Sequence, residues 1–335
     1  MGKQLRIWLF VLLGTLFTSS TLLAEGVITM TTSRTVGGII SLRIDANGDI
    51  TIEGVKETLQ TEDKVVYYTL TSQTITIRGD VTSFDCSDNQ LTSLDVSKNT
   101  SLTDLDCFNN QLMSLDVSKN TALTTLYCFD NQLTSLNVSR NRALTTLSCE
   151  GNQLTSLDVS KNTALTSLSC SDNQLTSLDV SKNTSLTDLD CFNNQLMSLD
   201  VSKNTALTTL YCFDNQLTSL NVSRNRALTT LSCGGNQLTS LDVSKNTALE
   251  GLYCSENQLT SLNISGCARL EDLFCFSNCI NGEAMTKLVN SLPDRMGMSR
   301  GTLCIVSRSS KKIDKNRCSA ADITTAKKKN WEVRQ

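Results

Sequence analysis

Ten of the fourteen cysteines in this chain follow one another at a constant interval of 21 residues. They are Cys86, Cys107, Cys128, Cys149, Cys170, Cys191, Cys212, Cys233, Cys254 and Cys275. The surrounding pattern is L-x-x-L-x-C-x-x-N-Q-L-x-x-L-x-V-x-x-N-x-x, of which residues 102–122, LTDLDCFNNQLMSLDVSKNTA, are a clean copy. A fixed period of this length indicates a repeat architecture, in which each unit stacks on the next and none is stable alone.

Each 21-residue unit has two similar halves, LTDLDCFNN and LMSLDVSKN in the copy quoted above. In each half the fourth and sixth places are apolar and alternate with polar places, which is the spacing of a β-strand. Each half ends on Asn, a residue that tolerates left-handed turns and bonds its own backbone. The sequence therefore predicts one coil per unit: a strand, a corner, a second extended side and another corner.

The cysteine occupies the sixth place, which points into the coil. Stacked strands lie about 4.8 Å apart, so the ten thiols should form a buried ladder. A free thiol behaves as a small apolar group and is often buried. Disulfides between successive rungs are the alternative, but an in-register ladder holds the Cβ vectors parallel, which suits disulfide torsion badly. We therefore expect reduced, structural thiols.

Residues 86–149 are identical to residues 170–233, four units further along. Chemistry does not demand identity at solvent-facing positions, so a duplication of the segment explains it. Since no residue inside the block is unique, a single-copy active site there is not expected.

The fifth and seventh places of the first half should face outward, and they carry most of the aromatic residues of the repeats. On a globular protein aromatics mostly go inside, so an exposed stripe of them indicates a binding surface. Ring stacking that merely stiffens the sheet is the alternative, and both can hold. The residues predicted to bind a partner are Asp106, Phe108, Tyr127, Phe129, Asp130, Asp190, Phe192, Tyr211, Phe213, Asp214, Tyr253, Phe274 and Phe276.

This face is also acidic: no lysine or arginine falls on the outward strand positions of the repeats or their flanks. The predicted partner is therefore a basic or sugar-bearing one, a protein or glycan at a cell surface, drawn by a charge that salt would screen. The balanced net charge of −3 gives no indication of nucleic-acid binding.

Two other functional classes compete with binding. Acidic pairs such as Asp104 and Asp106 could do acid–base work, but they recur in the second block, and no insertion between the coils forms a pocket. The chain also lacks histidine, the commonest general base. Corner oxygens, as in FDNQ, could hold calcium in a stiffened scaffold, but the glycine-rich nonapeptide pattern is missing. We expect no enzyme, no cofactor and no metal site.

The flanks lack the repeat and suggest caps for the ends of the stack. Residues 1–24, with Lys3, Arg6 and an apolar run, have the layout of a signal peptide, so we expect an exported protein, secreted or at the cell surface. Residues 25–80 are expected to be a β-rich cap, with a hairpin at Asn47-Gly48. Residues 81–280 carry ten repeats, and residues 281–335 alternate helix and strand patterns in a second cap.

The second cap holds five lysines, Lys311, Lys312, Lys327, Lys328 and Lys329, which we interpret as a solvated surface in preference to an anion-binding one. Four cysteines lie off the ladder, and any disulfide is to be sought among Cys267, Cys279, Cys304 and Cys318.

The half-pattern L-x-x-L-x-C-x-x-N-x-L, with cysteine in place of the inner leucine, resembles the internalin J-like leucine-rich-repeat proteins. The phrases LTSLDVSKNTALT and NQLTSLDVS resemble still more closely the internalin-like surface proteins of Bacteroidetes. The resemblance covers residues 81–280 and implies a right-handed leucine-rich-repeat solenoid, with a parallel sheet on one face and extended or 3-10 segments on the other, used for adhesion or protein binding outside the cell. No LPxTG-like sorting signal or immunoglobulin-like module occurs in the sequence, so wall anchoring of the Listeria kind is not supported.

Overall fold

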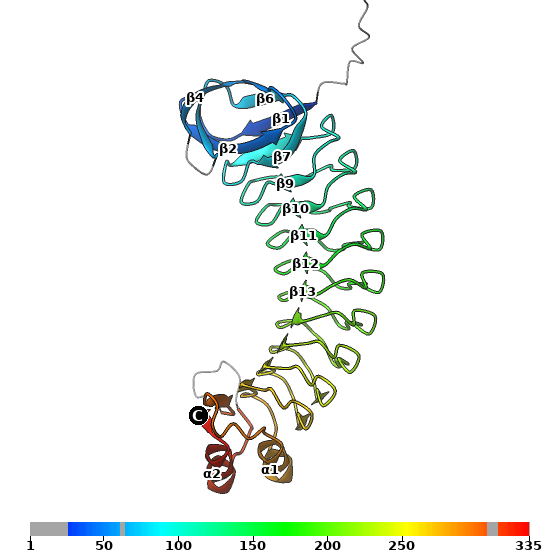
Figure 1. Ribbon diagram of the computed structural model, residues 1–335, viewed down its shortest axis with the longest axis vertical. Coiled ribbons are helices and arrows are strands. Elements are labelled where there is room, and N and C mark those ends of the chain that lie inside the picture. The colour runs from blue at the N-terminus through cyan, green and yellow to red at the C-terminus, as the bar shows by residue number, and fades with distance from the viewer. Residues whose placement is uncertain (1–25, 61–63, 307–313, 335) are drawn as a thin grey trace, which may run out of the picture.

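The computed structural model describes residues 26–60, 64–306 and 314–334. Figure 1 shows a stack of coils that bends into an arc, with a group of strands at the N-terminal end and two helices at the other. The expected signal peptide lies outside the described residues. The predicted fold class, a parallel leucine-rich-repeat solenoid between a β-rich cap and an α/β cap, is confirmed.

One strand from each coil joins a parallel sheet that runs the length of the arc. Equivalent residues stand opposite one another without slippage, as in Leu105 beside Leu126 and Leu126 beside Leu147. The register follows from the constant period of 21, which leaves no coil longer than its neighbour. In sheet order, the strands are β7 (Val81–Asp85), β9 (Asp104–Asp106), β10 (Thr125–Tyr127), β11 (Thr146–Ser148), β12 (Ser167–Ser169), β13 (Asp188–Asp190), β14 (Thr209–Tyr211), β15 (Thr230–Ser232), β17 (Gly251–Tyr253) and β19 (Asp272–Phe274).

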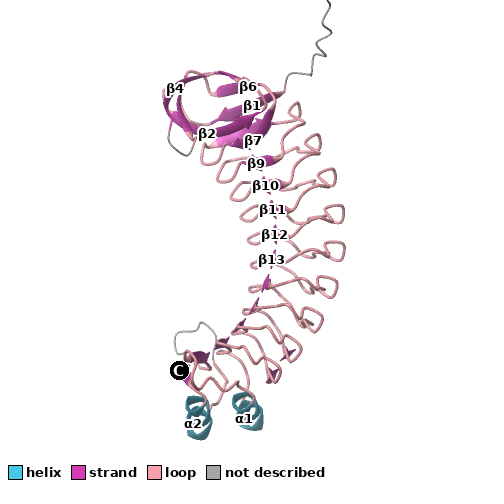
Figure 2. Ribbon diagram, in the orientation of Figure 1, coloured by secondary structure: helices cyan, strands magenta, loops and turns pink. Residues whose placement is uncertain are grey.

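The opposite side of each coil is extended and closes with two successive i to i+3 turns. In one coil the Asn120 N–H donates to the Val117 carbonyl at 3.0 Å, and the Leu123 N–H donates to the Asn120 carbonyl at 3.1 Å. Short strands occur here near both ends of the array: β8 (Leu91–Asp95), β16 (Ser240–Asp242) and β18 (Ser261–Asn263). Figure 2 shows that most of this side is drawn as loop.

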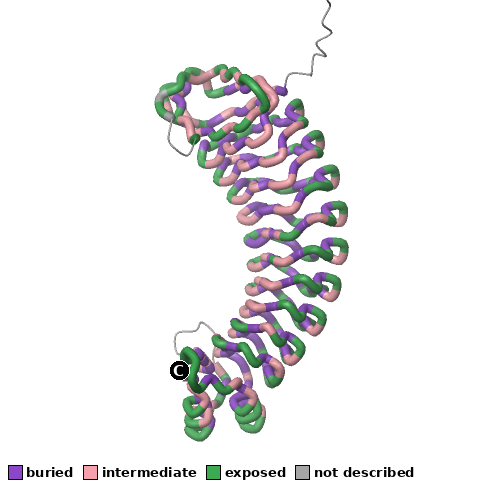
Figure 3. Tube along the Cα trace, in the orientation of Figure 1, coloured by how far each residue is buried: buried purple, intermediate pink, exposed green. Residues whose placement is uncertain are grey.

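The core is a continuous column of leucine, valine and cysteine side chains inside the coils. Figure 3 colours the residues along each coil that are buried. All ten ladder cysteines are fully buried and carry free thiols. Burial raises the pKa of Cys149 and of Cys233 to about 12, because the thiolate would lose its hydration. The ladder thiols are therefore neutral packing groups, as predicted.

Asparagine at the first corner ties each coil to the one before it. The Nδ2 of Asn110 donates to the carbonyls of Cys107, Phe108 and Cys86, and its Oδ1 accepts from the Leu91 N–H at 2.8 Å. These bonds satisfy buried backbone groups that a turn would otherwise leave unpaired.

The left-handed backbone predicted at this Asn falls one residue earlier, so that detail was wrong. It lies at Asn109, with φ of 49°, and at Asp130, with φ of 51°, in the next coil. The corner Asn is held by its amide bonds, and the exposed residue before it takes the positive φ. Glycine takes the same place at Gly151 and Gly235, where the conformation costs it nothing.

The N-terminal cap extends both sides of the first coil with antiparallel strands. One sheet runs β4 (Val55–Gln60), β5 (Val66–Leu70), β2 (Ile39–Ala46) and then β7. The other runs β3 (Thr51–Glu53), β6 (Thr74–Arg78), β1 (Val27–Thr32) and then β8. The two sheets close over a core that includes Met30, Leu42 and Ile77 and cover the apolar end of the solenoid.

The hairpin predicted at Asn47-Gly48 was wrong. In the described ranges β2 pairs with β5 and β7, whereas β3 pairs with β6 in the other sheet. The backbone N–H of Asn47 donates to the Asp80 carbonyl, and its Nδ2 donates to the Asp80 carboxylate. The turn therefore carries the chain from one sheet to the other.

The C-terminal cap imitates one more coil. It comprises α1 (Gly282–Asn290), β20 (Gly301–Cys304), α2 (Ala320–Lys328) and β21 (Trp331–Arg334), with β20 parallel to β19 and β21 parallel to β20. Ile305 is buried where the next ladder cysteine would stand. Asn316 replaces the next corner Asn: its Nδ2 donates to Cys275 O, and its Oδ1 accepts from the Ile280 N–H, both at 2.8 Å.

Candidate partner-binding surface

The outward side chains of the sheet strands and of the residue two places beyond each strand form one surface, which we call the ring face. All thirteen residues predicted to bind a partner lie in the described ranges. Their nine aromatic rings are half-buried, as are Asp106 and Asp190, whereas Asp130 and Asp214 are exposed at the first corner. Phe84, which stands at an inward strand position of the first coil, is buried. Whether the thirteen residues bind a partner stays a prediction.

Rings on neighbouring coils stack against one another. Phe108 and Phe129 are nearly parallel, with centroids 4.4 Å apart, and the duplicated pair Phe192 and Phe213 repeats this at 4.3 Å. Tyr127 meets Phe129 edge-on at 6.5 Å. Near the C-terminal end Tyr253 and Phe274 form a tilted pair at 5.3 Å. Stacking thus stiffens this face and also leaves part of each ring accessible.

Two equivalent aspartates on the ring face are poorly solvated. Partial burial raises the pKa of Asp106 to about 6, with the nearby charge of Asp85 adding to it. The pKa of Asp190 is likewise raised to about 6, by burial first and then by Glu150 and Asp172. In each carboxylate Oδ1 is buried and accepts no hydrogen bond. These are the least stabilised charges on the face.

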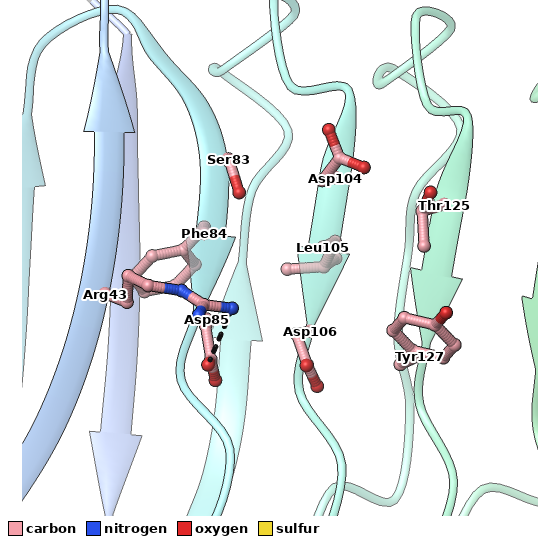
Figure 4. A pocket seen from close by; sticks show the side chains of 9 residues that line it. All are labelled: Arg43, Ser83, Phe84, Asp85, Asp104, Leu105, Asp106, Thr125 and Tyr127. Atoms are coloured by element: carbon pink, nitrogen blue, oxygen red, sulfur yellow. Dashed lines mark ion pairs between the residues drawn. The ribbon is translucent and has the colours of Figure 1, made fainter. Parts of the chain in front are cut away.

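A hollow of about 180 Å³ lies around Asp106, and we call it the first cup. Figure 4 shows Arg43 reaching from β2 to Asp85, with Asp106 and Tyr127 on the next two strands. The Nη2 of Arg43 stands 3.5 Å from Oδ2 of Asp85. The cup is lined by Arg43, Ser83, Phe84, Asp85, Asp104, Leu105, Asp106, Thr125 and Tyr127.

A second hollow of about 360 Å³, the second cup, lies around Asp190 in the duplicated block. Glu150 stands at its edge, where its Oε2 accepts from the Ser169 hydroxyl at 2.7 Å. None of its lining residues is a lysine or arginine. They are Glu150, Ser167, Leu168, Ser169, Asp188, Leu189, Asp190, Thr209 and Tyr211.

The expectation that the face carries no basic residue holds for the repeats, but the caps supply arginines at both ends: Arg43 on β2, and Arg334 on β21, which is in register with Cys304 and Phe274. Arg43 pairs with Asp85 at the N-terminal end. At the other end Arg295, itself only 3% exposed, donates to the Leu270 carbonyl and pairs with Glu271 at 3.0 Å. The polar alternation of SLRID marked Arg43 as outward-facing, but nothing in the repeat pattern placed it beside Asp85.

The four cysteines off the ladder also carry free thiols. Cys267 is buried at the second corner, where its thiol donates to the Val243 carbonyl at 3.3 Å, as the Asn side chains do in other coils. Cys279, Cys304 and Cys318 are half-buried in the C-terminal cap. The structure therefore contains none of the disulfides considered for these four.

No group of three or more cysteine and carboxylate side chains in the described ranges is placed to hold a metal ion. Over the same residues, no helix is both long enough and apolar enough to span a membrane.

Comparison with known proteins shows one matching family and several solved structures with the same fold. Residues 163–204 match the family model for leucine-rich repeats in two copies. The functional domain of InlJ from Listeria monocytogenes, which includes a cysteine ladder, is 38% identical with a TM-score of 0.63; the match covers 71% of this chain and 52% of that one. The chain thus spans about half the length of the InlJ structure. No curated protein matches the chain significantly.

More distant structures share the fold alone. YopM from Yersinia pestis is 22% identical with a TM-score of 0.53, covering 70% of this chain and 61% of that one. YopM from Yersinia enterocolitica is 24% identical with a TM-score of 0.50, covering 65% and 46%. Solenoids of this kind are typically non-catalytic scaffolds for protein interaction. With its 21-residue coils and its column of buried thiols, the chain is a leucine-rich-repeat protein of the cysteine-ladder type, similar to the internalin InlJ.

Proposed function

We propose that the chain is an exported protein, secreted or displayed at the cell surface, that binds a protein or glycan partner through the ring face. The observation that carries the proposal is the placement of nine aromatic rings on the outward side of a sheet, at places where other coils carry serine, glutamate or glycine. Aromatic residues give large contact areas at low entropic cost and dominate the energetics of many interfaces.

The acidic character of the face favours a basic partner over a neutral one. Both ends of the face are partly neutralised by arginines from the caps, so the uncompensated carboxylates lie in the middle, near Glu150, Asp188 and Asp190. A negative surface speeds association with a positive one, and salt weakens that effect.

The duplication presents the stacked ring pair twice. Phe108 with Phe129 and Phe192 with Phe213 are four strand spacings apart, roughly 19 Å along the sheet. A partner with a repeated epitope would engage both pairs, and the second contact would then be intramolecular.

The test replaces Tyr127, Phe129, Tyr211 and Phe213 by serine, a residue that other coils carry at these places. We expect binding of the labelled protein to host-cell, matrix or bacterial surfaces to fall at least about tenfold, since each buried interface aromatic contributes about 1–2 kcal/mol or more. The matched control replaces Met113 and Met197, which are 68% and 67% exposed on the other side of the coil, by serine.

If the variant keeps its fold and still binds as the native protein does, the ring face is not the binding surface. Loss of binding on removal of surface glycans identifies a glycan partner, and loss on protease treatment identifies a protein. Export is tested separately: the protein recovered outside the cell should begin at Glu25.

A further inference from the structure

The two cups are built from the duplicated block, yet they differ at one wall. Asp104, Asp106 and Tyr127 of the first cup correspond to Asp188, Asp190 and Tyr211 of the second. Only the first has β2 of the cap beside it, which places Arg43 opposite Asp85 in the strand register. The corresponding wall of the second cup carries Glu150 and Ser169.

Arg43 behaves as a built-in occupant of the first cup. Its guanidinium pairs with Asp85 at 3.5 Å, and its positive charge lowers the pKa of Asp106, which burial raises. The first cup has a volume of about 180 Å³, half the 360 Å³ of the second. A guanidinium therefore already lies at the first cup, paired with Asp85 and close enough to Asp106 to lower the pKa of that carboxyl.

The second cup keeps the counterparts of Asp104, Asp106 and Tyr127, carries Ser169 in the place of Asp85, adds the Glu150 carboxylate and has no lysine or arginine in its lining. Glu150 lines it from the corner after β11, and Asp188 and Asp190 line it from β13; the hydrogen bond from Ser169 holds the Glu150 carboxylate in place. Oδ1 of Asp190 is buried without a donor. Tyr211 adds an aromatic ring, and a guanidinium combines planar donors for carboxylates with affinity for a ring.

We propose that the second cup binds the guanidinium of an arginine side chain presented by the protein partner, and that Arg43 closes the first cup to the same ligand. This inference rests on the proposed function for its partner, but the cup itself can be probed without one. The identical blocks are therefore not equivalent in binding: the ring pairs are repeated, and the open cup occurs once.

The experiment uses the full chain labelled with 3-fluorotyrosine, whose five tyrosines include one in each cup, Tyr127 and Tyr211. Resonances are assigned by single Tyr→Phe substitutions. The probe is N-acetyl-arginine methylamide, and the matched neutral probe is the citrulline derivative. We expect a saturable shift of the Tyr211 fluorine with the arginine probe alone, and none at Tyr127.

Three variants sharpen the test. Asp190→Asn should weaken probe binding at Tyr211 by about tenfold or more, since it removes one charged hydrogen-bond acceptor. Asp200→Asn removes the same charge from the opposite side of the coil and should leave it unchanged; Asn137 and Asn221 already hold that turn in other coils. Arg43→Ala should open the first cup, so that the Tyr127 fluorine also responds.

Equal shifts with the citrulline probe, an unresponsive Tyr211, or a Tyr127 that stays silent in Arg43→Ala would each overturn the inference. None of these results depends on the ring-face variant described above. A responsive second cup together with unimpaired surface binding of the serine variant, which lacks Tyr211, would overturn the proposed function and leave the cup as an arginine site without the proposed partner.

Discussion

Asn173 and Asn183 occupy the two corners of one coil, and the structure predicts different costs for replacing them by alanine. Asn173 is 8% exposed and Asn183 is fully buried, so burial alone would rank Asn183 as the more costly. Their hydrogen bonds predict the opposite order.

Asn173 uses its whole amide. Its Nδ2 donates to the carbonyls of Cys149, Cys170 and Ser171 at 3.0, 3.2 and 3.0 Å, and its Oδ1 accepts from the Leu154 N–H at 2.9 Å. Asn183 donates only to the carbonyls of Val159 and Asn162, at 3.0 and 2.8 Å, and its Oδ1 is buried without a partner. The two amide hydrogens and the oxygen of Asn173 make three full hydrogen bonds, so at about 1 kcal/mol for each bond Asn173→Ala should cost ~3 kcal/mol and Asn183→Ala ~2 kcal/mol.

The assay is urea unfolding of each variant, followed by circular dichroism, with the slope against denaturant checked for a change in cooperativity. A third variant, Asn183→Cys, should cost less than Asn183→Ala, because Cys267 fills the same corner with a single bond to the Val243 carbonyl at 3.3 Å. If Asn183→Ala proves as destabilising as Asn173→Ala, hydrogen-bond counting at the corners is the wrong basis and buried volume the better one.

Two further measurements test the charges and thiols. The pKa of Asp190 is about 6 in the folded protein and near 3.8 when unfolded, so its contribution to stability is present at low pH and lost as the pH rises through 6. Asp190→Asn should therefore stabilise the protein at pH 7 by ~1 kcal/mol, after allowance for solvent screening, and have no effect near pH 4; an equal gain at both pH values would contradict this. In thiol titration of the native protein only Cys279, Cys304 and Cys318 should react, with Cys318 slowed because burial raises its pKa to about 11, and all fourteen should react after denaturation; rapid reaction of ladder thiols would refute their burial.

The period of 21 made the solenoid predictable, because it fixes the length of every coil and hence the register of every strand. Once Cys107 points inward, the alternation of a strand forces Asp106 and Phe108 outward, and that placement was correct. The buried thiol ladder followed from the same reasoning. Periodicity determines these features because each coil meets only copies of itself.

Contacts between the repeats and the caps were not predictable in this way. The hairpin signal at Asn47-Gly48 was local, whereas the pairing of β2 with β7 depends on how the cap fits the first coil. Arg43 and Arg295 reach the ring face from outside the period, so no count over the repeats includes them. The prediction for the first corner was correct in part. The sequence identified the Asn, but not its hydrogen bonds to the preceding coil, which span 24 positions in the sequence, as from Asn110 to Cys86.

Exact duplication in a stacked protein does not copy the environment at the edges of the block. The residue before the first block is Asp85, beside a cap strand, and the residue before the second is Ser169, beside another coil that carries Glu150. Interiors of the two blocks are equivalent, as the matching ring distances of 4.4 and 4.3 Å illustrate. The two cups at the start of the blocks are not equivalent, because one wall of each cup comes from the strand that precedes the block, which carries Asp85 in the first cup and Ser169 in the second. A duplication of whole coils thus creates new surface chemistry at its junction without a single substitution inside the block, and here the junction turns a filled cup into an open, more acidic one.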